Sequence, residues 1–336
     1  MSRKWPVAIG LMLTVLMALA IPFHNPLRTL ISLRKVDDYP LYVMDYYGDY
    51  GFEEFLRVGL ETDSRSQSYN RENSPLWACT CFSALNEEGH LILGRNFDWR
   101  NRPTLMLFTD PADGYASVTM VDMSYFGFDA EGPTWFNRTP LLDAPYLPFD
   151  GMNEHGLAVG MMAVSRADGG RDPQKKTISS LQAIRLMLDY AQDVDEAIAL
   201  LQHYNLDFGA GPPLHYLIAD SSGNSIVVEF LAGEMNVLRN NEPWQVSTNF
   251  IISEERPEGA ASSCWRYNEA YEALEQADGK ISTEEAMAIL KDVSQSGDYY
   301  TMWSIVYNMT TGDIRVAMGR KYDESKEFKL EMMANQ

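Results

Sequence analysis

Cysteine and histidine are both scarce in this chain, and their positions exclude most of the chemistry that they usually support. The 336 residues contain three cysteines and five histidines. Three cysteines cannot build a disulfide framework, and no pair of cysteines or histidines stands at the spacing of a zinc site. The histidines form no metalloprotease helix motif and accompany no serine nucleophile elbow. We therefore expect the protein to use neither a metal nor a cofactor.

Basic side chains are also few relative to acidic ones. Lysine and arginine number 27 against 47 aspartates and glutamates, which leaves a formal charge of −20. A field of this sign repels phosphate backbones, so we expect no nucleic-acid partner. The acidic residues are spread along the chain without a like-charge block, which favours solubility over substrate recognition as their role. With 46% hydrophobic residues, the chain can bury one large core or two modest ones.

The amino terminus carries a long apolar run. A basic start precedes the run from Trp5 to Phe23, in which Ala18-Leu19-Ala20 is typical of a cleavage site. The pattern predicts that residues 1–23 are an export signal, and a retained membrane anchor through residues 5–23 is the alternative. Either interpretation predicts a secreted or cell-envelope protein.

Residues 24–78 differ in composition from the rest of the chain. Residues 36–60 are aromatic and acidic, which predicts short packed helices, and they continue into ETDSRSQSYNRENSP (61–75), which is typical of an exposed linker. From Cys79 onward the pattern changes to strands and turns. We therefore predict a prosegment or linker over residues 24–78 and a separate folded domain over residues 79–336.

The pattern after Cys79 predicts an α+β domain. Strand-like runs CTCFSAL and HLILGRNF flank an NEEG turn, and further hairpins are predicted around DSSGN and NNEP. Helical periodicity marks residues 177–191 and 263–277, and two more helices begin at Asp193 and at the capping box Ser282–Glu285. Because strands and helices follow one another in blocks, we expect a layered α+β domain rather than alternating βαβ units.

The first predicted hairpin fixes the neighbours of Cys79. Closing it across NEEG, with Leu85 opposite His90, places Cys79 opposite Asn96. A β-bulge would bring Arg95 to within one residue of the same position. A thiol and a guanidinium are therefore predicted to lie together through local geometry alone.

Asp98 lies just beyond the open end of this hairpin. Arg95 would favour a thiolate by lowering the pKa of Cys79, and the carboxylate of Asp98 could hold an ammonium group. An amino-terminal cysteine carries such a group, whose unperturbed pKa of about 7.7–8.0 suits a base for its own thiol. The alternative is a buried strand cysteine beside an ordinary ion pair.

The same stretch resembles the start of a known family. CTCFSALNEEGHLILGRNFDW is similar to the beginning of the choloylglycine hydrolase group of N-terminal-nucleophile hydrolases, which includes bile salt hydrolases and penicillin V acylases. Cys79-Thr80 matches the family's Cys-Thr, and residues 94–98 match its Gly-Arg-Asn-x-Asp. The spacing makes Cys79, and not Cys81, the counterpart of the family's nucleophile.

Four later segments resemble the same family in the same order. DGMNEHGLAVGMMAV and LHYLIADSSGNSIVVEF are similar to a strand segment and a central hairpin of the family. VSTNF resembles the segment whose asparagine helps to form the oxyanion hole, which implies Asn249, and SSCWRYNEA implies Arg266 as the last active-site arginine. A backbone N–H near Ala163 would complete the oxyanion hole, where the bile salt enzymes usually carry asparagine. The long segment before Cys79 is more similar to acid ceramidase and its relatives.

The resemblance implies a four-layer αββα sandwich of two antiparallel sheets flanked by helices. It also implies hydrolysis of a linear amide C–N bond in a small N-acylated substrate by Cys79 through a thioester, after the chain is cleaved at Ala78–Cys79. The alternatives are an amidase for N-acyl lipids and a non-catalytic exported binding protein of the same fold. Self-association into a homo-oligomer is left open.

Overall fold

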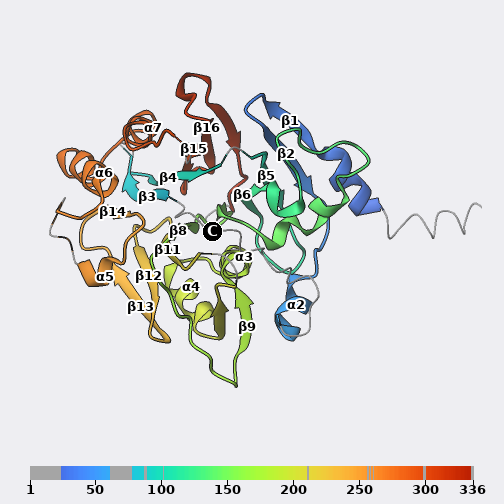
Figure 1. Cartoon of the computed structure of the whole chain (residues 1–336), viewed down its shortest axis with the longest axis horizontal. Helices are drawn as coiled ribbons and strands as arrows, with labels where there is room; N and C mark the ends of the chain where they lie inside the picture. The colour runs from blue at the N-terminus through green and yellow to red at the C-terminus, as the bar shows by residue number, and fades with distance from the viewer. Residues whose placement is uncertain are drawn as a thin grey trace, which may run out of the picture.

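Two β-sheets packed face to face form the centre of the molecule, and helices cover the outer side of each (Figure 1). The computed structural model describes residues 24–60, 78–86, 89–100, 102–209, 212–255, 257, 259, 261–297 and 300–333. The predicted export signal or anchor and the predicted linker over residues 61–75 lie outside these ranges.

The first sheet has nine strands in the order β1-β2-β5-β6-β7-β8-β11-β12-β13. Neighbouring strands are antiparallel except for β2 and β5, which run parallel. The strands are β1 (Arg34–Asp37), β2 (Leu41–Tyr46), β5 (Thr104–Thr109), β6 (Ser117–Asp122), β7 (Asp150–Asn153), β8 (Ala158–Ala163), β11 (Leu214–Ala219), β12 (Ser225–Leu231) and β13 (Glu234–Arg239).

The second sheet has six antiparallel strands in the order β14-β3-β4-β15-β16-β17. They are β14 (Gln245–Ser247), β3 (Ala78–Leu85), β4 (Leu91–Trp99), β15 (Tyr300–Asn308), β16 (Asp313–Met318) and β17 (Lys326–Lys329). All nine residues of β4 are buried, because this central strand has the other sheet on one side and helices on the other.

The helices divide between the two outer faces. The nine-stranded sheet is covered by α3 (Ser180–Tyr190) and α4 (Val194–Leu201), and the six-stranded sheet by α6 (Trp265–Gln276) and α7 (Thr283–Asp292). Shorter elements are α2 (Phe52–Val58), α5 (Ile252–Glu255), the parallel pair β9 (Lys176–Ser179) and β10 (Tyr204–Asp207), and the 3₁₀ turns η1 (Met123–Phe126), η2 (Thr139–Tyr146) and η3 (Tyr322–Glu324). The predicted four-layer αββα arrangement is therefore confirmed, with the parallel β2–β5 pair as an addition.

Local signals located the helix starts well. Ser282 and Glu285 form a reciprocal capping box at the start of α7, and the side chain of Asp193 caps α4 by accepting from the Glu196 N–H at 2.9 Å. Both caps satisfy backbone donors that a helix cannot pair internally. These predictions depended only on residues close together in the sequence, and both are confirmed.

The predicted hairpin around NNEP is wrong. Strand β13 pairs with β12 in the nine-stranded sheet, whereas β14 pairs with β3 in the six-stranded sheet. The chain therefore crosses between the sheets at this point. The side chain of Asn240 stabilises the crossing by accepting from the Ser225 N–H at 3.1 Å and donating to the Glu242 carbonyl at 2.9 Å.

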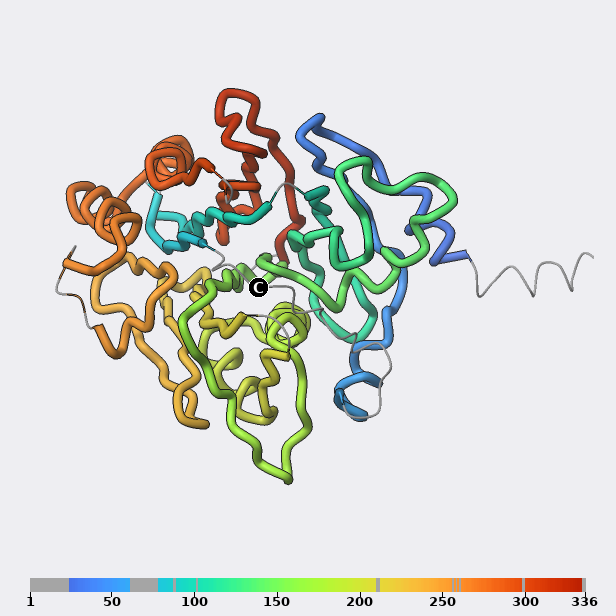
Figure 2. Tube along the Cα trace, viewed as in Figure 1, coloured from blue at the N-terminus to red at the C-terminus, as the bar shows by residue number. Residues whose placement is uncertain are grey.

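The segment before Cys79 is part of the sandwich. Strand β2 lies between β1 and β5, and its residues Leu41, Val43 and Met44 have no exposed surface. Within residues 36–60 the prediction of short helices is therefore wrong for the part that forms β1 and β2, where Tyr42 and Tyr46 lie on a strand, and it is correct for α2. Figure 2 traces this segment in blue along the edge of the nine-stranded sheet.

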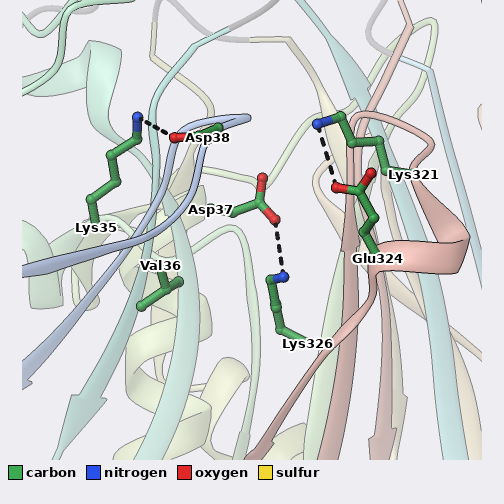
Figure 3. A pocket seen from close by; sticks show the side chains of 7 residues that line it. All are labelled: Lys35, Val36, Asp37, Asp38, Lys321, Glu324 and Lys326. Atoms are coloured by element: carbon green, nitrogen blue, oxygen red, sulfur yellow. Dashed lines mark hydrogen bonds and ion pairs between the residues drawn. The ribbon is translucent and has the colours of Figure 1, made fainter.

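Polar contacts tie the same segment to distant parts of the chain. The Tyr50 hydroxyl donates to the Asp189 carboxylate of α3 at 2.7 Å. Asp37 of β1 pairs with Lys326 of β17 at 3.7 Å, beside a polar hollow of about 310 Å³ that lies between β1 and η3 (Figure 3). The segment thus contacts both sheets, while the predicted domain boundary at Cys79 stays a prediction.

Within the residues that the structure describes, none of the helices combines the length and the apolar character that a bilayer crossing requires.

Candidate active site

The β3–β4 hairpin sets the geometry around Cys79, and its loop differs from the prediction. The Asn86 N–H donates to the His90 carbonyl, and the His90 N–H donates to the Asn86 side chain, both at 2.7 Å. Asn86 and His90 therefore close the loop themselves, and the first ladder pair is Leu85–Leu91. The predicted pairing of Leu85 with His90 was one residue out.

This one-residue shift decides which side chains share a face. Cys79 lies opposite Phe97, and Cys81 lies opposite Arg95. The prediction that Cys79 faces Asn96 is wrong, since Asn96 points to the other side and donates to the Leu290 carbonyl of α7 at 2.7 Å. Cys79, Cys81 and Arg95 all point into the space between the sheets.

Arg95 is the cation next to the thiol. It has no exposed surface, and its Nη2 lies 3.9 Å from the Cys79 sulfur. Its Nε forms an ion pair with Asp150 of β7 at 2.9 Å. Burial alone lowers the pKa of the guanidinium, but Asp150 and the two thiols raise it to a net value above the ordinary one. Arg95 therefore stays charged inside the core.

Asp150 is in turn held by two further donors. The Tyr307 hydroxyl donates to Asp150 at 2.6 Å, and the Trp303 indole N–H donates at 3.1 Å. A buried ion pair is stable only when its remaining lone pairs are satisfied, and these two contacts supply that. Close packing completes the arrangement, because a Cβ at Gly160 would come within 2.7 Å of the Cys81 sulfur and 3.1 Å of Arg95 Nη1.

The thiol itself is less acidic than the sequence predicted. Burial raises the pKa of Cys79 to about 11, and the opposing effects of Arg95 and Arg266 do not compensate for it. The predicted lowering of this pKa is therefore wrong for the uncut chain. The reason is that Cys79 has no exposed surface, so loss of hydration outweighs the attraction to the two cations.

The backbone of Cys79 is held by Asn249, which follows β14. The Cys79 N–H donates to Asn249 Oδ1 at 2.6 Å, and Asn249 Nδ2 donates to the Ala163 carbonyl at 2.8 Å. Asn249 therefore bridges the two sheets at the position where the thiol lies.

Ala163 presents its backbone to the same space. The Val164 N–H donates to the Pro213 carbonyl at 2.9 Å. Val164 therefore turns its backbone polar groups towards β11, as a hydrogen-bonded pair of the β8–β11 ladder does. Residues alternate in an antiparallel ladder, so Ala163 turns both its N–H and its carbonyl away from β11. The N–H that was predicted to complete an oxyanion hole lies on the side where Asn249 is bound.

Arg266, at the start of α6, reaches Cys79 from the helix side of the sheet. Its Nη1 donates to the Cys79 carbonyl and to the Thr80 hydroxyl, the latter at 3.1 Å. Its Nη2 donates to Asn249 Oδ1 at 2.8 Å. Arg266 thus fixes the peptide plane of Cys79 and the amide of Asn249 together.

Asp98 lies on this same helix side, opposite Ala78. Its carboxylate accepts from Thr301 at 2.6 Å and from Gln295 at 2.7 Å, and it lies 3.9 Å from Arg266. Burial raises the pKa of Asp98, and Arg266 with the two hydrogen bonds only partly offsets this effect. The structure thus brings all six predicted positions around one strand end.

Sequence reasoning missed the partners of these residues. Asp150 begins the segment DGMNEHG and was given no role, although an aspartate inside a fully apolar sheet is a signal for a buried cation. His215 and Glu229 were also missed. The His215 Nε2 donates to the Thr248 carbonyl at 2.7 Å, and its Nδ1 lies 3.6 Å from Glu229.

Glu229 extends this second cluster to the chain beyond Asn249. Its carboxylate accepts from the Ile252 N–H at 2.6 Å and from the Ser253 N–H at 3.2 Å. His215 and Glu229, from β11 and β12, therefore hold both flanks of the turn that carries Asn249. Among the described residues, no group of three or more histidine, cysteine or acidic side chains is placed to hold a metal ion.

A surface depression lies beside Asn249. It has a volume of about 400 Å³ and is lined by Ser165, Asn249, Phe250, Ile251, Glu254 and Glu255. Arg166 pairs with Glu254 at its edge. Asn249 lines this depression and also accepts from the Cys79 N–H, so it links the depression to Cys79, which does not itself line it.

Known proteins match this arrangement in sequence and in fold. The linear amide C–N hydrolases of the choloylglycine hydrolase family match residues 79–250, and the match begins at Cys79. A curated relative, an uncharacterized protein of Paramecium bursaria Chlorella virus 1, is 34% identical over 120 residues. That stretch spans 33% of this chain and 42% of the viral protein, less than two thirds of its length.

Two solved structures share the fold. A mutant of the conjugated bile acid hydrolase from Clostridium perfringens has a TM-score of 0.58 at 15% identity, covering 75% of this chain and 92% of its own. Penicillin V acylase from Agrobacterium tumefaciens has a TM-score of 0.53 at 19% identity, covering 72% and 83%. With a match over about half of its length that starts at the predicted nucleophile, the chain belongs to the linear amide C–N hydrolases, choloylglycine hydrolase family.

Proposed function

We propose that this protein hydrolyses a linear amide C–N bond in a small N-acylated molecule, with Cys79 as an amino-terminal nucleophile. The proposal rests on two contacts of Cys79. Its sulfur lies 3.9 Å from Arg95 Nη2, and its backbone N–H donates to Asn249 Oδ1 at 2.6 Å. A merely structural cysteine needs neither contact. Membership of the family, whose match starts at this residue, supports the same function.

The reaction follows from the groups around the sulfur. With a free α-amine on Cys79, that amine takes the thiol proton, and the thiolate attacks the amide carbonyl carbon, forming a C–S bond. The C–N bond then breaks as the ammonium returns its proton to the leaving amine. Water attacks the thioester, the amine accepts the proton of that water, and the carboxylic acid leaves with the thiol restored.

In this proposal two donors stabilise the charge that develops on the carbonyl oxygen. One is the Nδ2 of Asn249, and the other is the Ala163 N–H, which turns to the same side of β8. Loss of one such donor typically costs about 2.7–4 kcal/mol of transition-state stabilisation. Arg95 favours the thiolate and Asp98 orients the α-amine. Arg266 holds the peptide group of Cys79 in place by donating to its carbonyl.

The uncut chain requires a maturation step, and we propose that Cys79 performs it. The sulfur attacks the Ala78 carbonyl carbon and its proton passes to the Cys79 nitrogen as the Ala78–Cys79 C–N bond breaks. Water then hydrolyses the resulting thioester, which leaves an Ala78 carboxylate, a free Cys79 amine and the restored thiol. In the uncut chain the high pKa of Cys79, about 11, keeps the thiol protonated. The new ammonium beside the sulfur would then favour the thiolate.

Amino-terminal sequencing tests maturation and catalysis together. The active protein should begin Cys-Thr-Cys-Phe, and Cys79→Ala should remain uncut and inactive. Cys81→Ala is the matched control, because this thiol is equally buried on the same strand face but is not at the predicted cut. Cleavage of the Cys79→Ala chain would instead indicate an external protease, and activity in uncut protein would contradict the mechanism.

An amidase for N-acyl lipids is the second candidate, and the depression beside Asn249 favours it. Phe250 and Ile251 offer apolar surface there, while Glu254 and Glu255 oppose an amine product that carries its own carboxylate or sulfonate. Assays of matured protein on N-acylethanolamines, acyl homoserine lactones, conjugated bile acids and penicillin V would separate the candidates. A protein that binds these amides but never turns them over would support the non-catalytic alternative.

Export to the cell envelope or beyond is also part of this proposal. It is supported by the basic start and the apolar run from Trp5 to Phe23. Fractionation of the producing cells, followed by sequencing of the recovered protein, distinguishes a cleaved export signal from a retained anchor.

A further inference from the structure

An exposed apolar surface lies at the start of the described chain, far along the sequence from the residues that surround Cys79. Seven large apolar side chains are exposed among the described residues, and four of them belong to two neighbouring segments. Leu27 (50% exposed) and Ile31 (57%) lie on the helix over residues 24–32, and Trp135 (52%) and Phe136 (93%) lie on the loop before η2. We call these four residues the amino-terminal apolar surface.

The helix presents its apolar side outward because its polar side is docked. Thr29 is fully buried, and its hydroxyl accepts from the Tyr47 N–H at 2.9 Å. Leu27 and Ile31 each lie two positions from Thr29, about 200° around the helix axis, and they are four positions apart on one face. The helix is therefore fixed to the body by hydroxyl contacts while two aliphatic side chains point to solvent.

One arginine joins the loop to this helix. Arg138 donates from Nη1 to the Leu30 carbonyl at 2.8 Å, and its guanidinium lies 4.6 Å from the centre of the Trp135 ring. A second guanidinium, that of Arg28, stacks on Tyr47 at 3.9 Å. Aromatic rings, aliphatic side chains and guanidinium groups therefore gather on one end of the molecule, where the blue helix lies at the edge in Figure 1.

We propose that the amino-terminal apolar surface lies in the interfacial layer of a phospholipid bilayer. Tryptophan and phenylalanine on a polar rim are typical of contacts at that depth, and arginine stems extend towards phosphates from such positions. The occupant is indicated by the chain itself, because the apolar run Trp5–Phe23 ends directly before His24, the first residue that the structure describes. The surface therefore lies where the chain would leave a membrane.

The charge of the protein selects the type of membrane. A formal charge of −20 repels a strongly anionic surface, so the contact depends on apolar burial and not on long-range attraction. We therefore expect binding to zwitterionic phosphatidylcholine bilayers that changes little with salt. This inference rests on the retained anchor over residues 5–23. It is independent of the amide hydrolysis proposed for Cys79, and its failure would leave that proposal intact.

A fluorescent reporter on the full chain tests the contact. Phe136→Cys, in a Cys264→Ser background because Cys79 and Cys81 are buried, carries an environment-sensitive dye. Phosphatidylcholine vesicles that contain an acyl-chain nitroxide should blue-shift the emission and quench it at least about two-fold. Met333→Cys, with the same dye at a 52% exposed position outside the surface, is the matched control and should change little. Equal quenching at both positions, or quenching at neither, would overturn the proposal.

A second variant separates contact from simple tethering by residues 5–23. Leu27→Ser with Ile31→Ser keeps the tether but removes two apolar side chains, each worth about ten-fold in partition. It should at least halve the quenching of the dye at position 136, whereas Val58→Ser, at a 36% exposed position elsewhere, should not. Unchanged quenching in the double variant would show that the tether alone brings the loop near lipid. A blue shift without vesicles would show that another segment covers the surface, and either result rejects the proposal.

Discussion

Two buried arginine–aspartate pairs of nearly equal geometry have different neighbours in this protein. Arg95–Asp150 is 2.9 Å long and Arg185–Asp189 is 2.7 Å long, and neither arginine has any exposed surface. What differs is the third partner. Arg95 faces the sulfur of Cys79 at 3.9 Å, whereas Asp189 accepts a hydrogen bond from Tyr50 of the segment that precedes Cys79.

The comparison teaches that burial and pairing alone do not identify a functional charge. The Arg185 guanidinium also donates to the Ser117 hydroxyl at 2.6 Å, so all of its described contacts are structural. Arg95 has a neighbour with chemistry of its own, and its ion pair keeps it charged there. In the proposed reaction the first pair holds the cation beside the thiol, whereas the second pair fixes the amino-terminal segment against α3.

Removing each arginine in turn is the strongest way to break the comparison. Arg95→Met and Arg185→Met should each lower the free energy of unfolding by about 3–5 kcal/mol, since both leave a carboxylate buried without its cation. Only Arg95→Met should also abolish turnover per folded molecule. Denaturation curves combined with active-site titration provide the measurement. An equal loss of turnover per folded molecule in Arg185→Met would contradict the assignment of the two roles.

Asn249→Ala tests the surroundings of Cys79 by removing one hydrogen-bond donor. We expect kcat to fall about 10²- to 10³-fold, because a donor to the oxyanion is lost, while cleavage after Ala78 is measured separately by sequencing. Asn240→Ala is the matched control, since Asn240 stabilises a crossing between the sheets that lies away from Cys79. A similar loss of kcat in the control would assign the effect to the fold.

His215 forms a third buried pair, with Glu229. It sharpens the comparison because we expect it only to position the turn that carries Asn249. His215→Phe removes the donor to the Thr248 carbonyl, so the turn that carries Asn249 should shift and kcat should fall about ten-fold. His215→Gln can still donate to that carbonyl and should recover part of the loss without a change in KM. Equal kinetics for both variants would exclude a positioning role.

Tyr50→Phe examines the structural side. The hydroxyl donates to an aspartate in the core, and loss of a hydrogen bond to a charged group costs about 1.5–3 kcal/mol. Thermal unfolding should therefore begin at lower temperature, with kcat of the folded protein unchanged. Tyr47→Phe is the control, because in the described structure the Tyr47 ring stacks under Arg28 near the surface.

The smallest expected effect is a change in pH dependence. Burial raises the pKa of Asp189 to about 6, against the partial compensation of Arg185 and Tyr50. A carboxyl whose pKa is higher in the folded than in the unfolded state binds its proton better when folded, so its contribution to stability falls as pH rises from about 4 to 6. Asp189→Asn should flatten this slope, measured by urea unfolding at several pH values, and an unchanged slope would point to another group such as Asp122.

Features that depend on neighbouring residues were predictable from the sequence. The helix caps, most strands and the convergence of Cys79, Arg95 and Asn249 came from local patterns or from family resemblance. The hairpin register was missed by one residue because a side chain, that of Asn86, closes the loop, and such a bond leaves no trace in hydrophobic alternation.

Long-range features were not predictable from pattern alone. The strand β2 was missed because its partner β5 lies far along the chain and on the other side of Cys79. The direction of the pKa shift of Cys79 was also missed, because a nearby arginine is visible in the sequence whereas complete burial is not. Asp150 was missed for a related reason, since its role depends on packing between the two sheets.

The position of β2 has a consequence for the stability of the protein after cleavage of the chain. Strands β2 and β3 belong to different sheets, so a break after Ala78 leaves two chains that interlock without a covalent link. Folding of the uncut chain is unimolecular, but recovery after denaturation of the cut form becomes bimolecular and slows with dilution. After cleavage, the lifetime of the folded protein therefore depends on its rate of unfolding and not on a reversible folding equilibrium. A cleaved molecule that unfolds does not readily refold.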